Sequence, residues 1–343
     1  MISYVRGNLL EADVEALVNT VNTVGIMGKG IALQFRQAFP QVYDIYRKAC
    51  DRKEMKPGKV LLVATSRLLN PRFVINFPTK RHWKDNSRLE DIEIGLHDLV
   101  RVVKEHQIQS IAIPPLGCGN GGLDWDIVRP LIETAFAELP DVQVLVYEPQ
   151  GAPEAKVMPV ATLRPGMTLA RAAVIKVMEQ YREPGYALTK LEIQKLAYLL
   201  QTTGMNLRLD FVKQQYGPYA ENLNHALQHM EGHFIRGYGD RTRSTQVNVI
   251  PGAAEEADTY LVDKTEAVEQ IQRVSQLIEG FETPYGMELL ATVHWLATED
   301  PAVKDDVEAV VRGVYAWNEH KRKTFQERHI AIAWRHLHEY GWF

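Results

Sequence analysis

The sequence ALVNTVNTVGIMGKGIALQF, residues 16–35, decides the fold of the first half of the chain. Its apolar start, Ala16–Val18, predicts a buried strand, and Ile31–Phe35 predicts the beginning of an amphipathic helix. Three glycines lie between them: Gly25, Gly28 and Gly30. A tight turn would explain one glycine, but three at this spacing predict a loop whose backbone approaches an anion beside a helix N-terminus. The loop fits neither the P-loop, because Gly30 follows Lys29 where Ser or Thr is required, nor the G-x-G-x-x-G pattern.

A second glycine-rich loop follows at residues 114–122, PPLGCGNGG. It comes after an apolar strand, Ser110–Ile113, and before a helix that begins near Trp125 with Asp124 as its N-cap. In open α/β sheets, ligands bind at the carboxyl ends of the strands. The two loops are therefore expected to enclose one diphosphate from opposite sides.

Together these loops resemble those of the macrodomain, an ADP-ribose-binding fold, and the resemblance covers residues 1–150. MGKGIA and Asn76–Lys80 are similar to the branch of terminal ADP-ribose protein glycohydrolases, and more closely to DarG-type DNA ADP-ribosyl glycohydrolase antitoxins. The resemblance implies a hydrolase that cleaves the N-glycosidic bond between ADP-ribose and thymine bases of single-stranded DNA, with Lys80 as catalytic residue. The substrate-binding residues that it implies are Asn8, Leu9, Asn22, Gly28, Lys29, Gly30, Ile31, Thr79, Gly117, Cys118, Gly119, Asn120 and Gly121.

A lysine has a specific chemical use at the anomeric carbon C1″ of ADP-ribose. Neutral Lys80 can attack this carbon, expel the linked base and leave an imine that water hydrolyses. Arg81, His82 and Lys84 are expected to lower the pKa of Lys80 by like-charge repulsion if they face the same way. Alternatively, protonated Lys80 assists departure of the base while water attacks directly. A solvated basic loop is the other interpretation of Lys80–Lys84, but its place after a strand on the ligand-binding edge favours the catalytic one.

Several positions depart from the family pattern or extend it. Gly121 stands where protein-directed relatives carry an Asp that helps to resolve the lysine adduct, so either another group activates water or the covalent route is not used. Asp124 is expected to be a helix cap first and a catalytic group second. Asn8 replaces an Asp that holds the adenine amino group in many macrodomains. Asn22 is expected to hold the hydroxyls of the distal ribose, and Asn19 is a candidate for capping the turn.

Length and composition limit the class of protein. The chain has 343 residues, enough for about two domains, with 45% hydrophobic residues, 24% charged residues and a formal net charge of −4. The mild acidity argues against a dedicated basic nucleic-acid binder. Cys50 and Cys118 provide neither a disulfide framework nor metal-ligand spacing, so no metal or cofactor is expected. Without an apolar leader or a run of ~18 apolar residues, the sequence predicts a soluble, cytoplasmic protein that does not bind a membrane.

The pattern of elements predicts two domains joined by a linker. Residues 1–150 alternate strands and helices, which predicts a three-layer α/β/α domain with a mostly parallel mixed sheet. Expected strands are Ser3–Asn8, Ala16–Val18, Val60–Ala64, Phe73–Phe77, Ser110–Ile113 and Val142–Tyr147, and expected helices are 29–50 (broken or re-capped at Pro40), 89–106 and 125–138. Residues 151–166 are proline-rich and predict a linker. Residues 167–343 predict a mainly α-helical domain with helices 168–182, 189–203, 219–231, 264–281, 286–298, 303–320 and 324–340. The stretch 234–262 is less regular and is expected to hold a short hairpin around Val247–Ile250.

Part of the helical half resembles the Panacea (SocA-like antitoxin) domain, whose members carry similar K-L-x-Y and Y-G-P segments. The matching segments are Leu191–Tyr198 and Gln215–Tyr219, although Tyr216–Pro218 is by itself simply a turn before a helix. The resemblance implies that this half binds and inhibits a cognate DNA-modifying toxin of the DarT type.

Two surfaces are candidates for nucleic-acid-related roles. Lys80–Lys84 would form a modest basic segment that borders the site and contacts single-stranded DNA, with Trp83 stacking on a flanking base. Acidic groups of the helical half could imitate DNA phosphates toward the toxin or could simply be solvated helix faces. These groups are Glu255, Glu256, Asp258, Glu299, Asp300, Asp305, Asp306 and Glu308. Two alternatives stay open: a hydrolase acting on ADP-ribosylated protein, and a non-catalytic ADP-ribose reader with an interaction domain.

Overall fold

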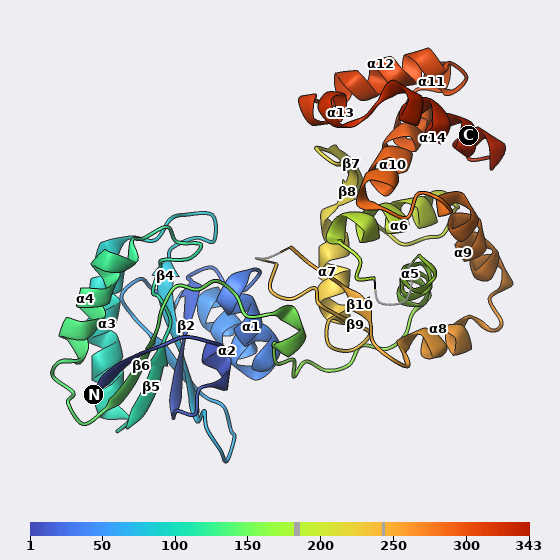
Figure 1. Cartoon of the computed structure of the whole chain (residues 1–343). Coiled ribbons are helices and arrows are strands. Elements are labelled where there is room, and N and C mark those ends of the chain that lie inside the picture. The colour runs from blue at the N-terminus through green and yellow to red at the C-terminus, as the bar shows by residue number, and fades with distance from the viewer. Residues whose placement is uncertain (182–185, 242–243) are drawn as a thin grey trace. The chain divides into compact units, whose positions relative to one another are not determined.

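The computed structural model describes residues 1–181, 186–241 and 244–343. The chain divides into two compact units (Figure 1). The first comprises Met1–Leu163 and Gly239–Arg243, and the second comprises Arg164–Tyr238 and Ser244–Phe343. The domain boundaries and the separate roles predicted for residues 1–150 and 167–343, with a linker between them, stay predictions.

A mixed sheet forms the centre of the first unit. Over the described residues its strands run in the order β1-β6-β5-β2-β4-β3, and all neighbours pair in parallel except β3, which is antiparallel to β4 at the edge. The strands are β1 (Ile2–Val5), β2 (Ala16–Asn22), β3 (Leu61–Ala64), β4 (Phe73–Lys80), β5 (Ser110–Ile113) and β6 (Gln143–Tyr147). The predicted mostly parallel sheet is confirmed.

Helices cover both faces of this sheet (Figure 1). The helices are α1 (Gly30–Ala38), α2 (Pro40–Asp51), α3 (Leu89–Glu105) and α4 (Trp125–Phe136). Ala16 and Val18 of β2 join the core with α3 and α4, whereas Leu17 joins the core with α1 and α2. Because successive strand residues point to opposite faces, a continuously apolar strand is buried on both. This is the predicted three-layer α/β/α arrangement.

Local sequence signals set several element boundaries in this unit. Pro40 occupies the first turn of α2, where its missing N–H leaves no helical hydrogen bond unmade. Asp124 caps α4 by accepting a hydrogen bond from the backbone N–H of Asp126. Both predictions are confirmed. The first strand is shorter than predicted, since β1 ends at Val5.

The second unit is mainly helical, as predicted. Helix α10 is its central element, because it packs against α6, α12 and α14 and is buried on most sides (Figure 1). The helices are α5 (Leu169–Gln180), α6 (Lys190–Thr202), α7 (Glu221–Met230), α8 (Ala253–Leu261), α9 (Thr265–Ile278), α10 (Pro284–Glu299), α11 (Pro301–Lys304), α12 (Val307–Trp317), α13 (Glu319–Thr324) and α14 (Glu327–Glu339). Two short antiparallel pairs accompany them: β7 (Phe211–Gln214) with β8 (Gly217–Ala220), and β9 (Ile235–Arg236) with β10 (Asn248–Val249). The last residue of the predicted helix 168–182 lies outside the described residues.

The prediction of one helix over 303–320 is wrong. Helix α11 ends at Lys304, and the side chain of Asp306 caps a new helix, α12. The side chain of Asn318 then accepts a hydrogen bond from the N–H of Lys321 and caps α13. Two N-caps in one apolar-periodic run therefore divide it, because each cap residue adopts an extended backbone conformation.

The irregular stretch 234–262 contains both a strand pair and a helix. A strand does form within Val247–Ile250, but it pairs with Ile235–Arg236 across a long connection and not in a short hairpin. Helix α8, which follows it, was not predicted. Its buried residues are Ala253, Ala257 and Leu261. Two small alanines give a weak hydrophobic period, so the sequence signal for this helix is faint.

The segment Tyr216–Pro218 belongs to the β7–β8 hairpin, so its interpretation as a simple turn before a helix is wrong. Lys195 of α6 is buried, and its Nζ donates a hydrogen bond to the backbone oxygen of Pro218 at 2.6 Å. Gly217 has a φ of +95°, and a Cβ there would lie 3.1 Å from Oγ1 of Thr292. The two Panacea-like segments therefore contact each other, with the lysine of the first holding the Gly-Pro of the second.

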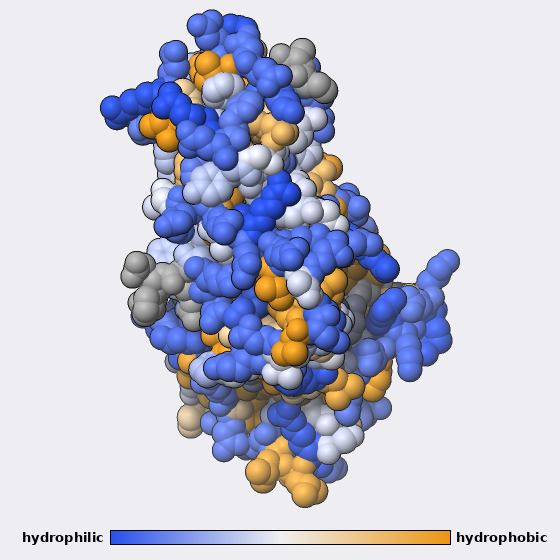
Figure 2. All heavy atoms as spheres, turned by 90° about the vertical axis from the view of Figure 1, so that its right-hand side faces the viewer, coloured by the Kyte–Doolittle hydropathy of each residue, from blue (hydrophilic) through white to orange (hydrophobic). Residues whose placement is uncertain are grey.

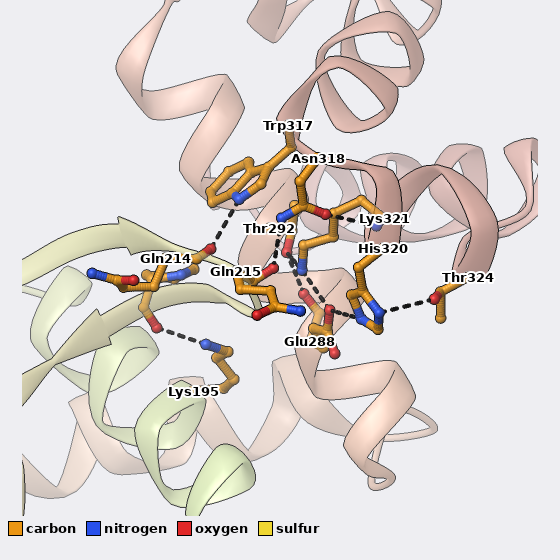
Figure 3. A network of polar contacts seen from close by, with 11 residues as sticks. Lys195, Gln214, Gln215, Glu288, Thr292, Trp317, Asn318, His320, Lys321 and Thr324 are labelled. Carbon is orange, nitrogen blue, oxygen red and sulfur yellow. Dashed lines mark hydrogen bonds and ion pairs between the residues drawn. The ribbon is translucent and has the colours of Figure 1, made fainter.

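A buried polar network beside Lys195 also holds the hairpin (Figure 3). Lys321 is fully buried, and its Nζ donates to Oε1 of Glu288 at 2.6 Å and to Oγ1 of Thr292 at 2.9 Å. Nδ2 of Asn318 donates to the backbone oxygen of Gln215 in the hairpin turn at 2.9 Å. Helices α10 and α13 thus fix the position of the β7–β8 hairpin within this unit.

The surface has no large continuous hydrophobic area on the face drawn in Figure 2, where hydrophobic residues form small groups among hydrophilic ones. Within the described part of the chain, no helix combines the length and apolar character that crossing a membrane requires.

Candidate functional site

Lys80 lies at the carboxyl end of β4, where the two predicted loops meet. The register of β2 and β4 places Asn22 opposite Lys80, after an irregularity between Val21 and Asn22. From this position Nζ of Lys80 donates a hydrogen bond to the backbone oxygen of Asn120 in the second glycine loop. The structure therefore brings together the first loop, Lys80 and the second loop, as the shared edge of the sheet predicts.

The pKa of Lys80 is lowered from its ordinary value by burial, because leaving water disfavours the charged amine. The carboxylate of Asp85 acts in the opposite direction. The predicted repulsion by neighbouring cations is wrong as the cause. Arg81 instead forms two hydrogen bonds of 3.1 and 3.0 Å with the buried carboxylate of Asp91. That carboxylate compensates the positive charge of the guanidinium.

Asn22 shapes the first loop from within. Its Oδ1 accepts hydrogen bonds from the N–H groups of Val24 and Ile26 at 3.0 and 3.3 Å, and its Nδ2 donates to the backbone oxygen of Ile26 at 2.6 Å. The hydroxyl of buried Tyr46 donates to the backbone oxygen of Asn22 at 2.7 Å. The Asn22 amide is thus largely engaged in the turn, and its predicted contact with the distal ribose stays a prediction.

Asn19 does not cap this turn, contrary to the prediction. Its side chain is buried in the sheet, and Nδ2 donates to Oδ1 of Asn76 on the neighbouring strand at 3.0 Å. Asn19 and Asn76 are register partners in β2 and β4. The pair links the two strands that carry Asn22 and Lys80.

Helix α1 begins without a side-chain cap, and the N–H group of its first residue, Gly30, is already hydrogen-bonded. Gly30 has a φ of +63°, and Lys29 before it is exposed and makes no side-chain cap. Ile31 is half-buried in the first helical turn. Within the first unit, the N–H of Gly30 donates to the backbone oxygen of Asp240 at 3.0 Å, and Nε2 of Gln34 donates to Oδ2 of Asp240 at 2.6 Å. Sequence reasoning missed Asp240, because no motif marks it and it lies far away along the chain.

The second glycine loop is closed around Gly121. A Cβ at this position would lie 2.2 Å from Oγ of Ser87 and 2.3 Å from the backbone oxygen of Gly117, distances that real Cβ atoms do not show. The N–H of Ser87 also donates to the backbone oxygen of Gly121 at 2.9 Å. Any side chain here, an aspartate included, would force the loop to shift, so this loop conformation favours glycine. Sequence reasoning did not identify Ser87 as the residue beneath the loop.

The exposed residues of the loop are Gly119, Asn120 and Gly122. A Cβ at Gly119 would meet no atom within 4 Å. Cys118 is half-buried, and burial raises the pKa of its thiol to about 11. The thiol is therefore protonated near neutral pH, so its side chain does not supply a thiolate nucleophile.

The remaining predicted residues are placed as follows. Oδ1 of Asn8 accepts a hydrogen bond from the N–H of Leu10 at 3.1 Å, so Asn8 caps a short 3-10 helix, Leu9–Glu11. The side chain of Leu9 lies in the hydrophobic core, which leaves only its backbone for a ligand. Gly28 is partly exposed in the first loop, and Thr79 is buried directly before Lys80. Their roles in binding stay predictions.

Comparison with known proteins gives the family. Residues 18–132 match the macro domain. A protein of Thermus aquaticus named DNA ADP-ribosyl glycohydrolase is 49% identical over 334 residues, which span 97% of this chain and 92% of that protein. The chain belongs to the DNA ADP-ribosyl glycohydrolase family.

Two further proteins match less than half of the chain. A Thermosipho africanus DNA ADP-ribosyl transferase-DNA ADP-ribosyl glycohydrolase fusion protein is 38% identical over 163 residues, 43% of this chain and 42% of that protein. The solved macrodomain of Mycobacterium tuberculosis DarG is 54% identical and superposes with a TM-score of 0.43, covering 44% of this chain and 99% of that one.

Among the residues that the structure describes, no group of three or more His, Cys, Asp or Glu side chains is arranged to hold a metal ion. In the second unit of this glycohydrolase-family chain, several of the predicted acidic groups have internal partners. Glu256 pairs with Arg164 at 2.6 Å, and Asp258 pairs with Lys176 at 2.9 Å. Asp306 caps α12. These contacts use part of the acidic charge, and phosphate mimicry stays a prediction.

Proposed function

We propose that this protein hydrolyses the N-glycosidic bond that joins ADP-ribose to thymine bases of single-stranded DNA, with Lys80 at the reacting carbon. The observation that carries the proposal is the position of Lys80: it ends β4 opposite Asn22 and reaches the backbone of Asn120, between the two glycine loops. ADP-ribose lying between these loops would present its C1″ to this amine. The backbone of exposed Gly119 and the partly exposed Gly28 are the proposed diphosphate contacts.

The lowered pKa of Lys80 supports a nucleophilic step. The lone pair of the neutral amine would attack C1″, the bond from C1″ to the base would break, and the base would leave with the electron pair and take up a proton. The nitrogen lone pair would then break the C1″–O bond of the ribose ring to give an imine, and water would hydrolyse this imine, which returns the lysine and releases ADP-ribose. The alternative leaves Lys80 protonated, as an electrostatic aid to the departing base. The lack of room for a carboxylate at Gly121 and the capping role of Asp124 favour neither route by themselves.

The DNA-directed substrate class is supported by the names of the relatives, which specify DNA. It is tested by incubating the intact protein with a single-stranded oligonucleotide carrying ADP-ribosylated thymidine and measuring released ADP-ribose. We expect release by the wild type and a loss of at least about 100-fold in Lys80→Ala, because a group at the reacting carbon contributes this much or more. An ADP-ribosylated peptide serves as the competing substrate.

Lys104→Ala is the matched lysine control. Lys104 lies in the last turn of α3, which leads into the start of β5 and not to the carboxyl ends of the strands where Lys80 lies. It forms an exposed ion pair with Glu138 at 2.5 Å. Turnover in Lys104→Ala should equal that of the wild type. Release from the peptide but not from DNA would move the assignment to a protein-directed hydrolase, and ADP-ribose binding without any release would indicate a reader.

The second part of the proposal is that the helical unit binds and inhibits a cognate toxin of the DarT type, so that the chain acts as an antitoxin. The fusion relative, whose name joins a DNA ADP-ribosyl transferase to a DNA ADP-ribosyl glycohydrolase, supports a functional partnership of the two activities. Lys80→Ala separates binding from hydrolysis. When this full-length variant is mixed with the transferase, DNA modification should fall in proportion to the concentration of the variant. If the transferase still modifies DNA at an excess of the variant, inhibition by binding is refuted.

A further inference from the structure

An exposed tryptophan lies three residues beyond Lys80. Trp83 is 48% exposed, although large aromatic side chains are usually covered. Nζ of Lys84 lies 4.9 Å from the centre of the Trp83 ring, and the ring of His82 lies 5.5 Å from it. We call His82–Lys84 the rim. It presents an aromatic face and a positive charge at one place on the surface.

The rim adjoins the first glycine loop. Oγ1 of Thr23 donates a hydrogen bond to the backbone oxygen of Arg81 at 2.6 Å, which ties the loop to the start of the rim. Val24 and Ile26 on this loop are 43% and 44% exposed. Three exposed apolar side chains thus come from the two segments that flank Lys80.

The rim has no evident structural task that would require a tryptophan. Arg81, which precedes it, is held by the carboxylate of Asp91 and fixes the backbone there. Trp83 belongs to none of the three hydrophobic clusters described for this unit. An aromatic ring beside a lysine is the combination that binds single-stranded nucleic acid, because bases stack on the ring and phosphates pair with the cation.

We propose that the rim is a second nucleotide subsite, in which Trp83 stacks on the base next to the ADP-ribosylated one and Lys84 pairs with the phosphate between them. This inference rests on the proposed function, since it concerns how the DNA strand is held beside Lys80. It makes Trp83 a specificity residue that distinguishes a modified strand from an isolated modified nucleoside. The cleavage of the bond at C1″ itself would not depend on Trp83.

The test compares two substrates in wild type, Trp83→Ala and Trp83→Phe: an ADP-ribosylated oligonucleotide and ADP-ribosylated thymidine. Trp83→Ala should lower kcat/KM for the oligonucleotide by about 5- to 150-fold, the range expected for loss of one base–aromatic stack. Its kcat/KM for the nucleoside should stay within about twofold of the wild type. Trp83→Phe, which keeps a ring, should recover most of the loss.

Binding of an unmodified single-stranded oligonucleotide gives a readout that does not require turnover. We expect weaker binding in Trp83→Ala and a smaller dependence of affinity on salt in Lys84→Ala, because one phosphate contact is lost. Leu68→Ala, which removes a fully exposed apolar side chain elsewhere, is the control and should change neither assay.

The two proposals fail in different ways. If the wild type releases no ADP-ribose from DNA but its oligonucleotide binding depends on Trp83, the proposed hydrolysis fails and the subsite stands. Equal losses on both substrates, no loss on either, or a loss confined to an ADP-ribosylated peptide would overturn the subsite.

Discussion

The substitution Gly121→Ala tests whether the second glycine loop requires glycine for steric reasons. The added Cβ would lie 2.2 Å from Oγ of Ser87 and 2.3 Å from the backbone oxygen of Gly117. An ordinary contact needs about 3.4 Å or more, so the loop would have to move by about 1 Å. The Ser87 hydroxyl can rotate away, but the Gly117 carbonyl is backbone and cannot yield without shifting the loop.

Overpacking of this kind typically costs about 1–3 kcal/mol of unfolding free energy. A shift of about 1 Å in a positioning element also costs on the order of 100-fold in turnover. We therefore expect Gly121→Ala to unfold at lower denaturant concentration and to bind ADP-ribose weakly, measured by chemical denaturation and by titration calorimetry.

Gly119→Ala is the matched control in the same loop. Its Cβ meets no atom within 4 Å, and its φ lies outside the left-handed region, so its stability should stay within about 0.5 kcal/mol of the wild type. If Gly119 contacts the diphosphate, the control still loses affinity, but without loss of stability. Equal stability of Gly121→Ala and Gly119→Ala would refute the steric argument.

Three further predictions concern titrating groups. If neutral Lys80 attacks C1″, kcat/KM should rise with pH up to the lowered pKa of Lys80. Cyanoborohydride should then trap an ADP-ribose adduct on Lys80. A kcat/KM that falls with pH, together with no trapped adduct, would support the protonated alternative. Burial lowers the pKa of Lys195 to about 7 and that of Lys321 to about 8. Above these pH values the unfolded chain binds more protons than the folded one. The free energy of unfolding should therefore rise with pH from about 7 to 9. The gain is at most about 1.4 kcal/mol per pH unit and group, and denaturation of Lys195→Met should show a flatter dependence than the wild type. Glu288→Gln removes the carboxylate that accepts a hydrogen bond from Lys321 and leaves a buried ammonium without its counter-ion. This should lower the free energy of unfolding, measured by denaturant titration, by about 3–5 kcal/mol. The control Glu319→Gln, at an exposed ion pair, should lower it by less than about 1 kcal/mol.

The sequence by itself determined the three-layer first unit, the positions of the two glycine loops and the importance of Lys80. These follow from local signals: apolar strands with a period of two, glycines after strands, and caps such as Pro40 and Asp124. The parallel sheet brings the carboxyl ends of its strands to one edge, so the sequence predicts that Asn22 and Lys80 lie near each other. Their position opposite each other in β2 and β4 agrees with this prediction.

Only the tertiary structure decided what each of these side chains contacts. Burial rather than neighbouring cations lowers the pKa of Lys80, Asn19 pairs across strands with Asn76, and the Ser87 side chain lies against Gly121. In the helical unit, no residue pattern near Lys195 indicates that its amine donates a hydrogen bond to the backbone oxygen of Pro218. Desolvation, side-chain pairing and steric exclusion depend on groups distant along the chain, and a local pattern of residues carries no information about which distant groups will lie beside it.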